Sequence, residues 1–140
     1  MMAPRTVLPC LAALVLALAG CGGEEEPRDG ADPGRPAPAT QLTVRVDPDG
    51  DGPQPAKEAR ITCHTGGGDR GCEAAQRLRP EHFEPTPSDV ACTELYGGPE
   101  IATIEGTLQR ETVSGRFSRQ DGCEIARWEK VADVLGAAGR

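Results

Sequence analysis

Four cysteines restrict the fold of this chain more than any other feature: Cys63, Cys72, Cys92 and Cys123. The aromatic residues available for a core are few: Phe83, Phe117, Tyr96 and Trp128. A small domain with so thin a core commonly depends on disulfides, which persist in oxidising compartments outside the cytoplasm. We therefore expect two disulfides. Four cysteines allow three pairings, and their spacing does not choose among them.

The N-terminal segment has the layout of an export signal. Residues 1–20 carry one early cation, Arg5, ahead of an apolar run at 7–19 that is too short to span a bilayer comfortably. The segment ends in Leu18-Ala19-Gly20-Cys21, which resembles the bacterial lipobox, where the leader is cut before a lipid-bearing cysteine. We expect a signal peptide at 1–20 and a lipid on Cys21, which would anchor an extracellular protein to the outer face of the cell membrane. The alternative is an ordinary signal peptide cut nearby, with Cys21 incidental.

Residues 21–40 predict a disordered linker. The stretch GGEEEPRDGADPGRPAPAT is rich in glycine, proline and acids and holds no large apolar residue. Such a segment cannot bury enough surface to offset the entropy of ordering itself. It would hold residues 41–135, which have the length of one small domain, away from the membrane.

Residues 41–135 predict an α+β fold. Apolar and polar residues alternate as in strands at 41–46, 58–63, 101–108 and 111–118, which suggests two hairpins, the second turning at Gln109-Arg110. A short helix is expected at 71–79, ended by Pro80, and another after the capping-box pattern that starts at Asp121. The second helix places four apolar residues on one side: Ile125, Trp128, Ala132 and Leu135. We expect an antiparallel sheet of about five strands with two helices on one face.

Two metal-site patterns occur, and neither has a suitable context. The residues that fit the EF-hand calcium loop are Asp47, Asp49, Asp51, Gly52 and Glu58. The run before them is strand-like and three prolines stiffen the loop, so we interpret residues 47–58 as an acidic turn that binds calcium at best weakly. His64 adjoins Cys63, but no C-x-x-C spacing indicates zinc. We expect no metal site and no cofactor.

Charge and motifs exclude two classes of function. The net charge is −7, and the arginines are interleaved with acids, so no basic face for nucleic acid is expected. His64 and His82 lack a serine or cysteine partner in a recognisable nucleophile motif. We therefore expect a binding protein rather than an enzyme.

Six short motifs in residues 41–131 together resemble one known family. They are LTV at 42–44, ITC at 61–63, GC at 71–72, AC at 91–92 followed by Tyr96, FS at 117–118 and GCE at 122–124. The succession is similar to the subtilisin-inhibitor-like proteins, which are secreted bacterial inhibitors of serine proteases. The resemblance implies the pairings Cys63 to Cys72 and Cys92 to Cys123. Members of that family commonly form dimers through the sheet, so a homodimer is also an expectation.

The resemblance also implies a reactive loop at Ala91-Cys92-Thr93-Glu94-Leu95-Tyr96. In that family the scissile bond follows the second residue after the cysteine, which makes Glu94 the P1 residue and Leu95 the P1′ residue. The implied partner is an extracellular serine protease. The family more often carries Met, Leu, Lys or Arg at P1, so Glu94 leaves two classes of target open, a subtilisin-like enzyme and a glutamate-specific one. The alternative is a non-inhibitory surface lipoprotein that uses the same scaffold as a structural or interaction module.

Overall fold

The computed structural model describes residues 36–50, 52–65 and 68–138. Along the chain the elements are β1 (Thr40–Asp47), β2 (Lys57–Cys63), α1 (Arg70–Gln76), the 3₁₀ helix η1 (Pro80–Phe83), β3 (Ile101–Leu108), β4 (Glu111–Phe117) and α2 (Gly122–Leu135). The expected signal peptide, the lipidation of Cys21 and residues 21–35 of the expected linker lie outside the described residues. Within the described ranges, no helix has the length and apolar character needed to cross a membrane.

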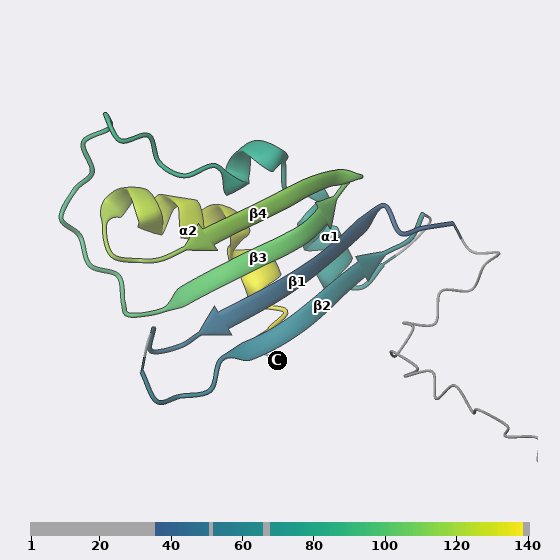
Figure 1. Cartoon of the computed structure of the whole chain (residues 1–140), viewed down its shortest axis with the longest axis horizontal. Coiled ribbons are helices and arrows are strands. Elements are labelled where there is room, and N and C mark those ends of the chain that lie inside the picture. The colour runs from purple at the N-terminus through teal and green to yellow at the C-terminus, as the bar shows by residue number, and fades with distance from the viewer. Residues whose placement is uncertain (1–35, 51, 66–67, 139–140) are drawn as a thin grey trace, which may run out of the picture. The chain divides into compact units, whose positions relative to one another are not determined.

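The four strands form one antiparallel sheet in the order β2-β1-β3-β4, and the helices lie over one of its faces (Figure 1). The predicted α+β fold is confirmed, as are both hairpins: β1 pairs with β2, and β3 pairs with β4. The predicted turn at Gln109-Arg110 joins β3 to β4, and both residues adopt positive φ angles of 51° and 72°. Such angles give a two-residue turn the twist that the flanking strands require.

The sheet has four strands in the described residues, one fewer than the five or so expected. The other stretch long enough to add a strand is residues 84–100, and this segment forms an irregular loop. Pro85, Pro87 and Pro99 lie in it, and each proline lacks the amide that a strand would use to pair with a neighbour. The prolines near both ends of the segment therefore disfavour its pairing with the sheet there.

Alternate residues of the strands form the core beneath the helices. The largest fully buried side chains from the sheet are Leu42, Val44, Ile104, Leu108 and Phe117. The helix predicted after Asp121 is confirmed as α2, and the Asp121 carboxylate caps it by accepting a hydrogen bond from the Glu124 amide at 2.9 Å. The prediction of which side of α2 faces the core was partly wrong.

Helix α2 buries Val131, Val134 and Leu135, whereas Ala132 is exposed and Ile125 is only half-buried. Apolar residues are so frequent in this helix that two stripes have helical spacing, and the position of the sheet, which the helix sequence does not specify, selects the stripe through Val131 and Val134. Trp128 is half-buried and packs against the core, as expected. The helix expected at 71–79 is present as α1 but ends at Gln76, and Pro80 begins η1, because proline is compatible with the first turn of a helix. This places Phe83 edge-on to Phe117, with ring centroids 6.0 Å apart.

Both implied disulfides are present. Cys63 at the end of β2 bonds to Cys72 in α1, with their Cα atoms 5.6 Å apart, and Cys92 bonds to Cys123 in α2, with their Cα atoms 5.4 Å apart. The first joins the edge strand to a helix. The second joins the long loop to the start of α2.

Candidate functional site

The loop between η1 and β3 is the main irregular segment of the described chain, and it runs past the start of α2 (Figure 1). Residues 91–98 have no regular secondary structure and no turn. Three large apolar residues are exposed in the described part of the chain, and all of them lie in this loop: Val90 (49%), Leu95 (61%) and Tyr96 (68%). The exposure of all three on one loop of a small domain is typical of a surface for binding a partner.

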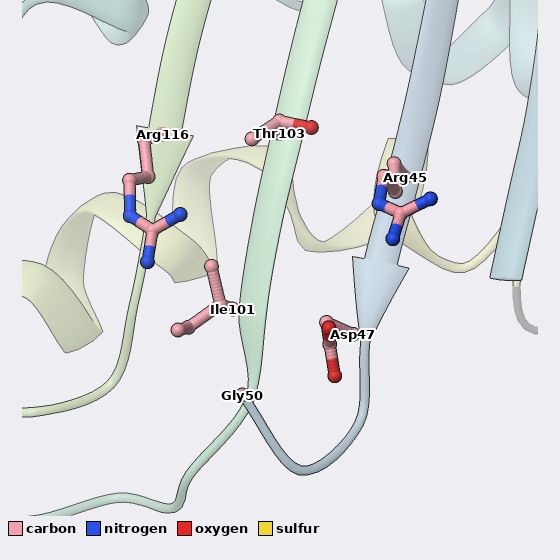
Figure 2. Close-up of a pocket in the computed structure, with 6 residues that line it drawn as sticks. All are labelled: Arg45, Asp47, Gly50, Ile101, Thr103 and Arg116. Atoms are coloured by element: carbon pink, nitrogen blue, oxygen red, sulfur yellow. The ribbon is translucent and has the colours of Figure 1, made fainter. Parts of the chain in front are cut away.

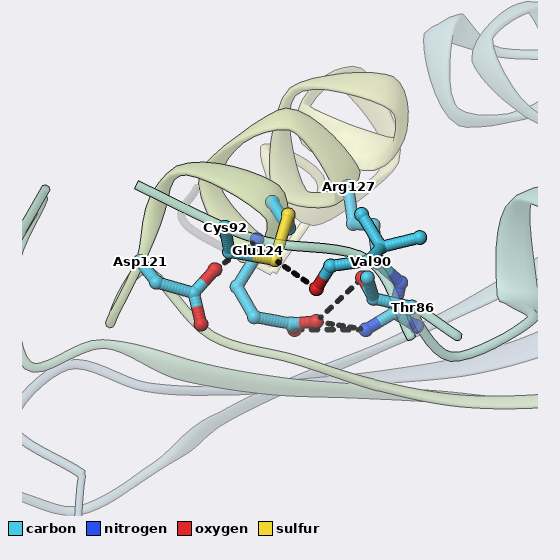
Figure 3. Close-up of a disulfide and its surroundings, with 7 residues drawn as sticks. Thr86, Val90, Cys92, Asp121, Glu124 and Arg127 are labelled. Atoms are coloured by element: carbon cyan, nitrogen blue, oxygen red, sulfur yellow. Dashed lines mark hydrogen bonds and ion pairs between the residues drawn. A yellow bond between two sulfur atoms is a disulfide. The ribbon is translucent and has the colours of Figure 1, made fainter. Parts of the chain in front are cut away.

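The first attachment of the loop is covalent. Cys92 is bonded to Cys123, which lies in the first turn of α2 (Figure 3). Because Asp121 caps that turn and α2 packs on the core through Val131 and Val134, the disulfide fixes Cys92 to a rigid element. Of the predicted site residues, Cys92 is therefore an anchor, and its half-buried position agrees with that role.

Two backbone hydrogen bonds hold the loop on either side of its most exposed residues. The Gly122 amide donates to the Thr93 carbonyl oxygen at 3.0 Å, and the Gly97 amide donates to the Arg119 carbonyl oxygen at 2.7 Å. Between these bonds lie Glu94, Leu95 and Tyr96, all exposed. We call residues 94–96 the exposed arc. It is short, and both of its ends are fixed to the residues that lead into α2.

Two glycines make this close approach of backbone to backbone feasible. A Cβ atom at Gly122 would collide with Oγ1 of Thr93, and a Cβ atom at Gly97 would lie 3.1 Å from Cδ1 of Ile125 and 3.2 Å from Cβ of Arg119. Both distances at Gly97 are shorter than ordinary carbon contacts. A side chain at either position would push the loop away from α2.

Arg119 supports the part of the loop that follows the exposed arc. Its guanidinium Nη1 lies 3.2 Å from Oε1 of Glu100, and its Cζ lies 5.9 Å from the centre of the Trp128 ring. Since the Arg119 carbonyl also binds Gly97, one residue holds both Gly97 and Glu100. Arg119 therefore holds the chain on both sides of Gly98 and Pro99, where the loop leads into β3.

A separate network fastens the beginning of the loop (Figure 3). Oγ1 of Thr86 donates to Oε1 of Glu124 at 3.3 Å, and Oε2 of Glu124 lies 2.8 Å from Nη1 of Arg127. The Arg127 side chain is only 11% exposed, and its guanidinium also donates to the carbonyl oxygens of Phe83 and Arg116. This largely buried cation ties the first turn of α2 to both η1 and β4.

The described residues hold one close trio of potential metal ligands, Cys92, Asp121 and Cys123. Both sulfurs are in a disulfide, so they offer no thiolate, and the Asp121 carboxylate caps α2. In the EF-hand-like turn, Oδ2 of Asp49 accepts a hydrogen bond from the Gln54 amide at 3.0 Å. Glu58 lies in β2 opposite Arg45, and Asp51 lies outside the described residues. This turn is stabilised by its own acids.

A shallow hollow lies on the uncovered face of the sheet (Figure 2). Arg45, Thr103 and Arg116 lie in one row across β1, β3 and β4. Asp47 also lines the hollow, and Glu58 pairs with Arg45 in the register of β1 and β2. The charges here are mixed in sign, so the row does not form a basic surface for an anionic polymer.

The structure brings the six predicted site residues, Ala91 to Tyr96, together as one continuous exposed segment, apart from the half-buried Cys92. Sequence reasoning missed the residues that hold it: Thr86, Gly97, Arg119, Gly122, Glu124 and Arg127. Gly122, in the predicted capping-box pattern, was the available signal, since glycine permits a close approach of the backbone to a neighbouring segment.

No family model matches this chain, and neither a curated protein nor a solved structure matches it.

Proposed function

We propose that this protein inhibits a serine protease through substrate-like binding of the loop Ala91–Tyr96, with Glu94-Leu95 as the scissile bond. The observation that supports it most is the exposed arc of Glu94, Leu95 and Tyr96 between two backbone anchors and beside a disulfide. An extended, exposed segment can pair with the backbone of a protease cleft as a substrate strand does. The proposal requires neither a cofactor nor a catalytic residue of this chain.

Fixing the arc in advance accounts for inhibition rather than digestion. A loop that is already held in one shape loses little conformational entropy when it docks. If the protease cuts the arc, the Glu94 side remains fixed through Cys92 and Thr93, and the Leu95 side remains fixed through Gly97. The two new ends stay close, so reforming the bond competes with hydrolysis.

Glu94 narrows the class of target. Its side chain is exposed, and as a P1 residue it would enter the specificity pocket of the protease. A carboxylate that enters an apolar pocket loses its hydration without gaining a partner, which is unfavourable by several kcal/mol. The target is therefore a serine protease with basic or hydrogen-bonding groups in that pocket, of which a glutamate-specific enzyme is the clearest case.

An extracellular location is part of the proposal. Two disulfides in a small domain suit an oxidising compartment, and the Leu18-Ala19-Gly20-Cys21 sequence suits a lipid anchor on Cys21. A mass spectrum of the mature protein tests the anchor: we expect a diacylglyceryl group on Cys21. An N-terminus elsewhere without a lipid would contradict it.

A panel of serine proteases tests the inhibitory function. We expect the protein to inhibit a glutamate-specific enzyme better than subtilisin-like or trypsin-like enzymes, with an intact Glu94-Leu95 bond in most of the complex. Inhibition of no member would contradict the proposal. That result would favour the alternative, a non-inhibitory lipoprotein whose exposed Val90, Leu95 and Tyr96 bind another partner.

A further inference from the structure

We propose that Arg119 is a positioning residue that decides how often a cleaved Glu94-Leu95 bond is resealed, and so how long inhibition lasts. This inference rests on the proposed function and adds to it a residue outside the loop. Arg119 does not touch the scissile bond; it acts through Gly97 and Glu100.

The two sides of the scissile bond are held by different means. On the Glu94 side, the disulfide from Cys92 to Cys123 is covalent. On the Leu95 side, the described contacts that fix the chain before β3 centre on Arg119: its carbonyl accepts from the Gly97 amide at 2.7 Å, and its guanidinium pairs with Glu100 at 3.2 Å. A substitution of Arg119 keeps this carbonyl but removes the side-chain contacts to Glu100 and Trp128 that hold residue 119 in place, so it loosens the Gly97 bond by freeing its acceptor to move.

The Arg119 side chain is itself fixed by two contacts, so it can hold the Leu95 side of the loop in place. It lies between Glu100 and the Trp128 ring, whose centre is 5.9 Å from Cζ. Arg119 and Glu100 are only 34% and 31% exposed, so water screens the pair less than it screens a pair at the surface. Oε2 of Glu100 is buried and has no hydrogen-bond partner among the described residues. Without Arg119, this carboxylate would move toward water and take the end of the loop with it.

The chemistry of resealing shows why this matters. In the forward step the serine oxygen of the protease attacks the Glu94 carbonyl carbon, the bond from that carbon to the Leu95 nitrogen breaks, and the nitrogen takes a proton and leaves as an amine. In the reverse step the Leu95 amine attacks the acyl ester, the peptide bond forms again, and the serine recovers its proton. Water competes by attacking the same ester, which leaves Glu94 with a free carboxylate and ends the cycle.

The anchor at Gly97 determines how far the Leu95 amine can move from the acyl ester. With Gly97 fixed, two residues, 95 and 96, are free; with Gly97 and Glu100 both released, the free segment is residues 95–100. The effective concentration of a tethered end falls roughly as the −3/2 power of tether length, so this change lowers it about fivefold. Hydrolysis then gains about fivefold over resealing.

The test measures cleavage and inhibition separately in Arg119→Ala, made in the full chain. The protease is the member of the panel that the wild-type protein inhibits best. We expect an association rate within about twofold of wild type, because the substrate strand itself is unchanged. Hydrolysis of Glu94-Leu95, followed as a mass gain of one water molecule, should be faster, by up to about fivefold where Gly97 is released completely, and inhibition should fade correspondingly sooner. Arg119→Lys, which keeps the charge beside Glu100, should restore most of the lifetime.

Arg77→Ala is the matched control, because it removes an arginine from an ion pair with Asp133 whose side chains are 64% and 74% exposed. It should leave the cleavage rate unchanged. If Arg119→Ala does not fold, Glu100→Gln removes the same ion pair and takes its place. Hydrogen exchange adds a readout that needs no protease: the Gly97 amide should lose protection in Arg119→Ala but not in Arg77→Ala.

Each outcome separates the two claims. A wild-type protein that inhibits while Arg119→Ala is cleaved no faster than Arg77→Ala overturns the role of Arg119 and leaves the proposed function standing. A wild-type protein that inhibits no protease overturns the proposed function and this inference together.

Discussion

The amide of Gly122 donates a hydrogen bond to the carbonyl oxygen of Thr93, 3.0 Å away. The next two residues of α2 also hold the loop: Cys123 through its disulfide to Cys92, and Glu124 through its carboxylate to Thr86. Three successive residues at the start of one helix therefore bind three points of the loop. Because this turn is capped by Asp121 and belongs to a helix that packs on the core further along, through Val131 and Val134, the loop is held against a regular, anchored element.

The first prediction concerns Gly122. In Gly122→Ala the new Cβ collides with Oγ1 of Thr93, so either Thr93 rotates or the loop moves away from α2. We expect the free energy of unfolding to fall by about 1 kcal/mol and the inhibition constant to rise. Urea unfolding and inhibition assays measure both quantities.

Adding Thr93→Ala to Gly122→Ala removes the colliding hydroxyl and should recover most of the inhibition. Gly136→Ala is the control, since a Cβ there would find its nearest atom at an ordinary 3.4 Å. If Gly122→Ala inhibits as well as the wild type, the exposed arc does not depend on this anchor.

The second prediction separates the two disulfides. Replacing both cysteines of a pair by serine frees the unfolded chain, and the loop-closure estimate gives a loss of roughly 3 kcal/mol for Cys63–Cys72 and roughly 4 kcal/mol for Cys92–Cys123, whose sequence separations are 9 and 31. We expect the variant without Cys92–Cys123 to become a substrate that the protease cuts and does not reseal.

The variant without Cys63–Cys72 is the matched comparison. It should be less stable, yet at temperatures where it is folded it should inhibit nearly as well as the wild type, because this bond joins β2 to α1 and does not touch the loop. Equal loss of inhibition in the two folded variants would show that the disulfides act through stability alone.

Much of the framework follows from local patterns in the sequence. Alternation of apolar and polar residues identified the strands β1 to β4, and the Asp121-Gly122-Cys123-Glu124 pattern identified the start of α2. These signals work because a strand or a helix cap depends on residues that lie close together in the chain. The side of α2 that is buried could not be obtained in this way, since it depends on where the sheet lies.

The candidate site shows the same division. The cysteine and the residues after it marked the loop, but the hydrogen bond from Gly97 to Arg119 joins two backbone groups. Backbone groups are the same in every residue, so such a bond has no signature in the sequence. Contacts between distant residues, such as Arg119 with Glu100 and Thr86 with Glu124, likewise appear only once the chain is folded.

The third prediction follows from the charge of the loop. No lysine or arginine occurs in residues 80–109. Glu100 is paired with Arg119, whereas the exposed Glu84, Asp89 and Glu94 form no ion pair among the described residues. Like charges near a binding surface mainly change the rate of association with a partner of opposite charge, and salt screens the effect. A target with a basic specificity pocket should therefore associate more slowly with Asp89→Asn, by about threefold at low salt.

Glu111→Gln is the control for this effect. It removes one negative charge at the start of β4, beside the turn between β3 and β4. The loop joins β3 at Ile101, which is the opposite end of that strand. Stopped-flow association at several salt concentrations should show a difference between the two variants that vanishes at high salt, with dissociation rates unchanged. Identical rates for Asp89→Asn and Glu111→Gln would mean that only the net charge of the molecule matters.

The fourth prediction concerns Glu94, the proposed P1 residue. Glu94→Lys should shift inhibition toward trypsin-like enzymes and Glu94→Leu toward subtilisin-like enzymes, because the P1 side chain enters the specificity pocket and each 1.4 kcal/mol of complementarity is about tenfold in affinity. The thermal midpoint should stay nearly unchanged, since the side chain is exposed and forms no ion pair with the described residues. Inhibition constants against trypsin, subtilisin and a glutamate-specific protease measure the shift.

Glu84→Lys, which makes the same charge change elsewhere on the loop, should leave the order of preference as in the wild type. If Glu94→Lys and Glu84→Lys alter the three constants alike, Glu94 is not the P1 residue, and the scissile bond has to be sought elsewhere in the loop.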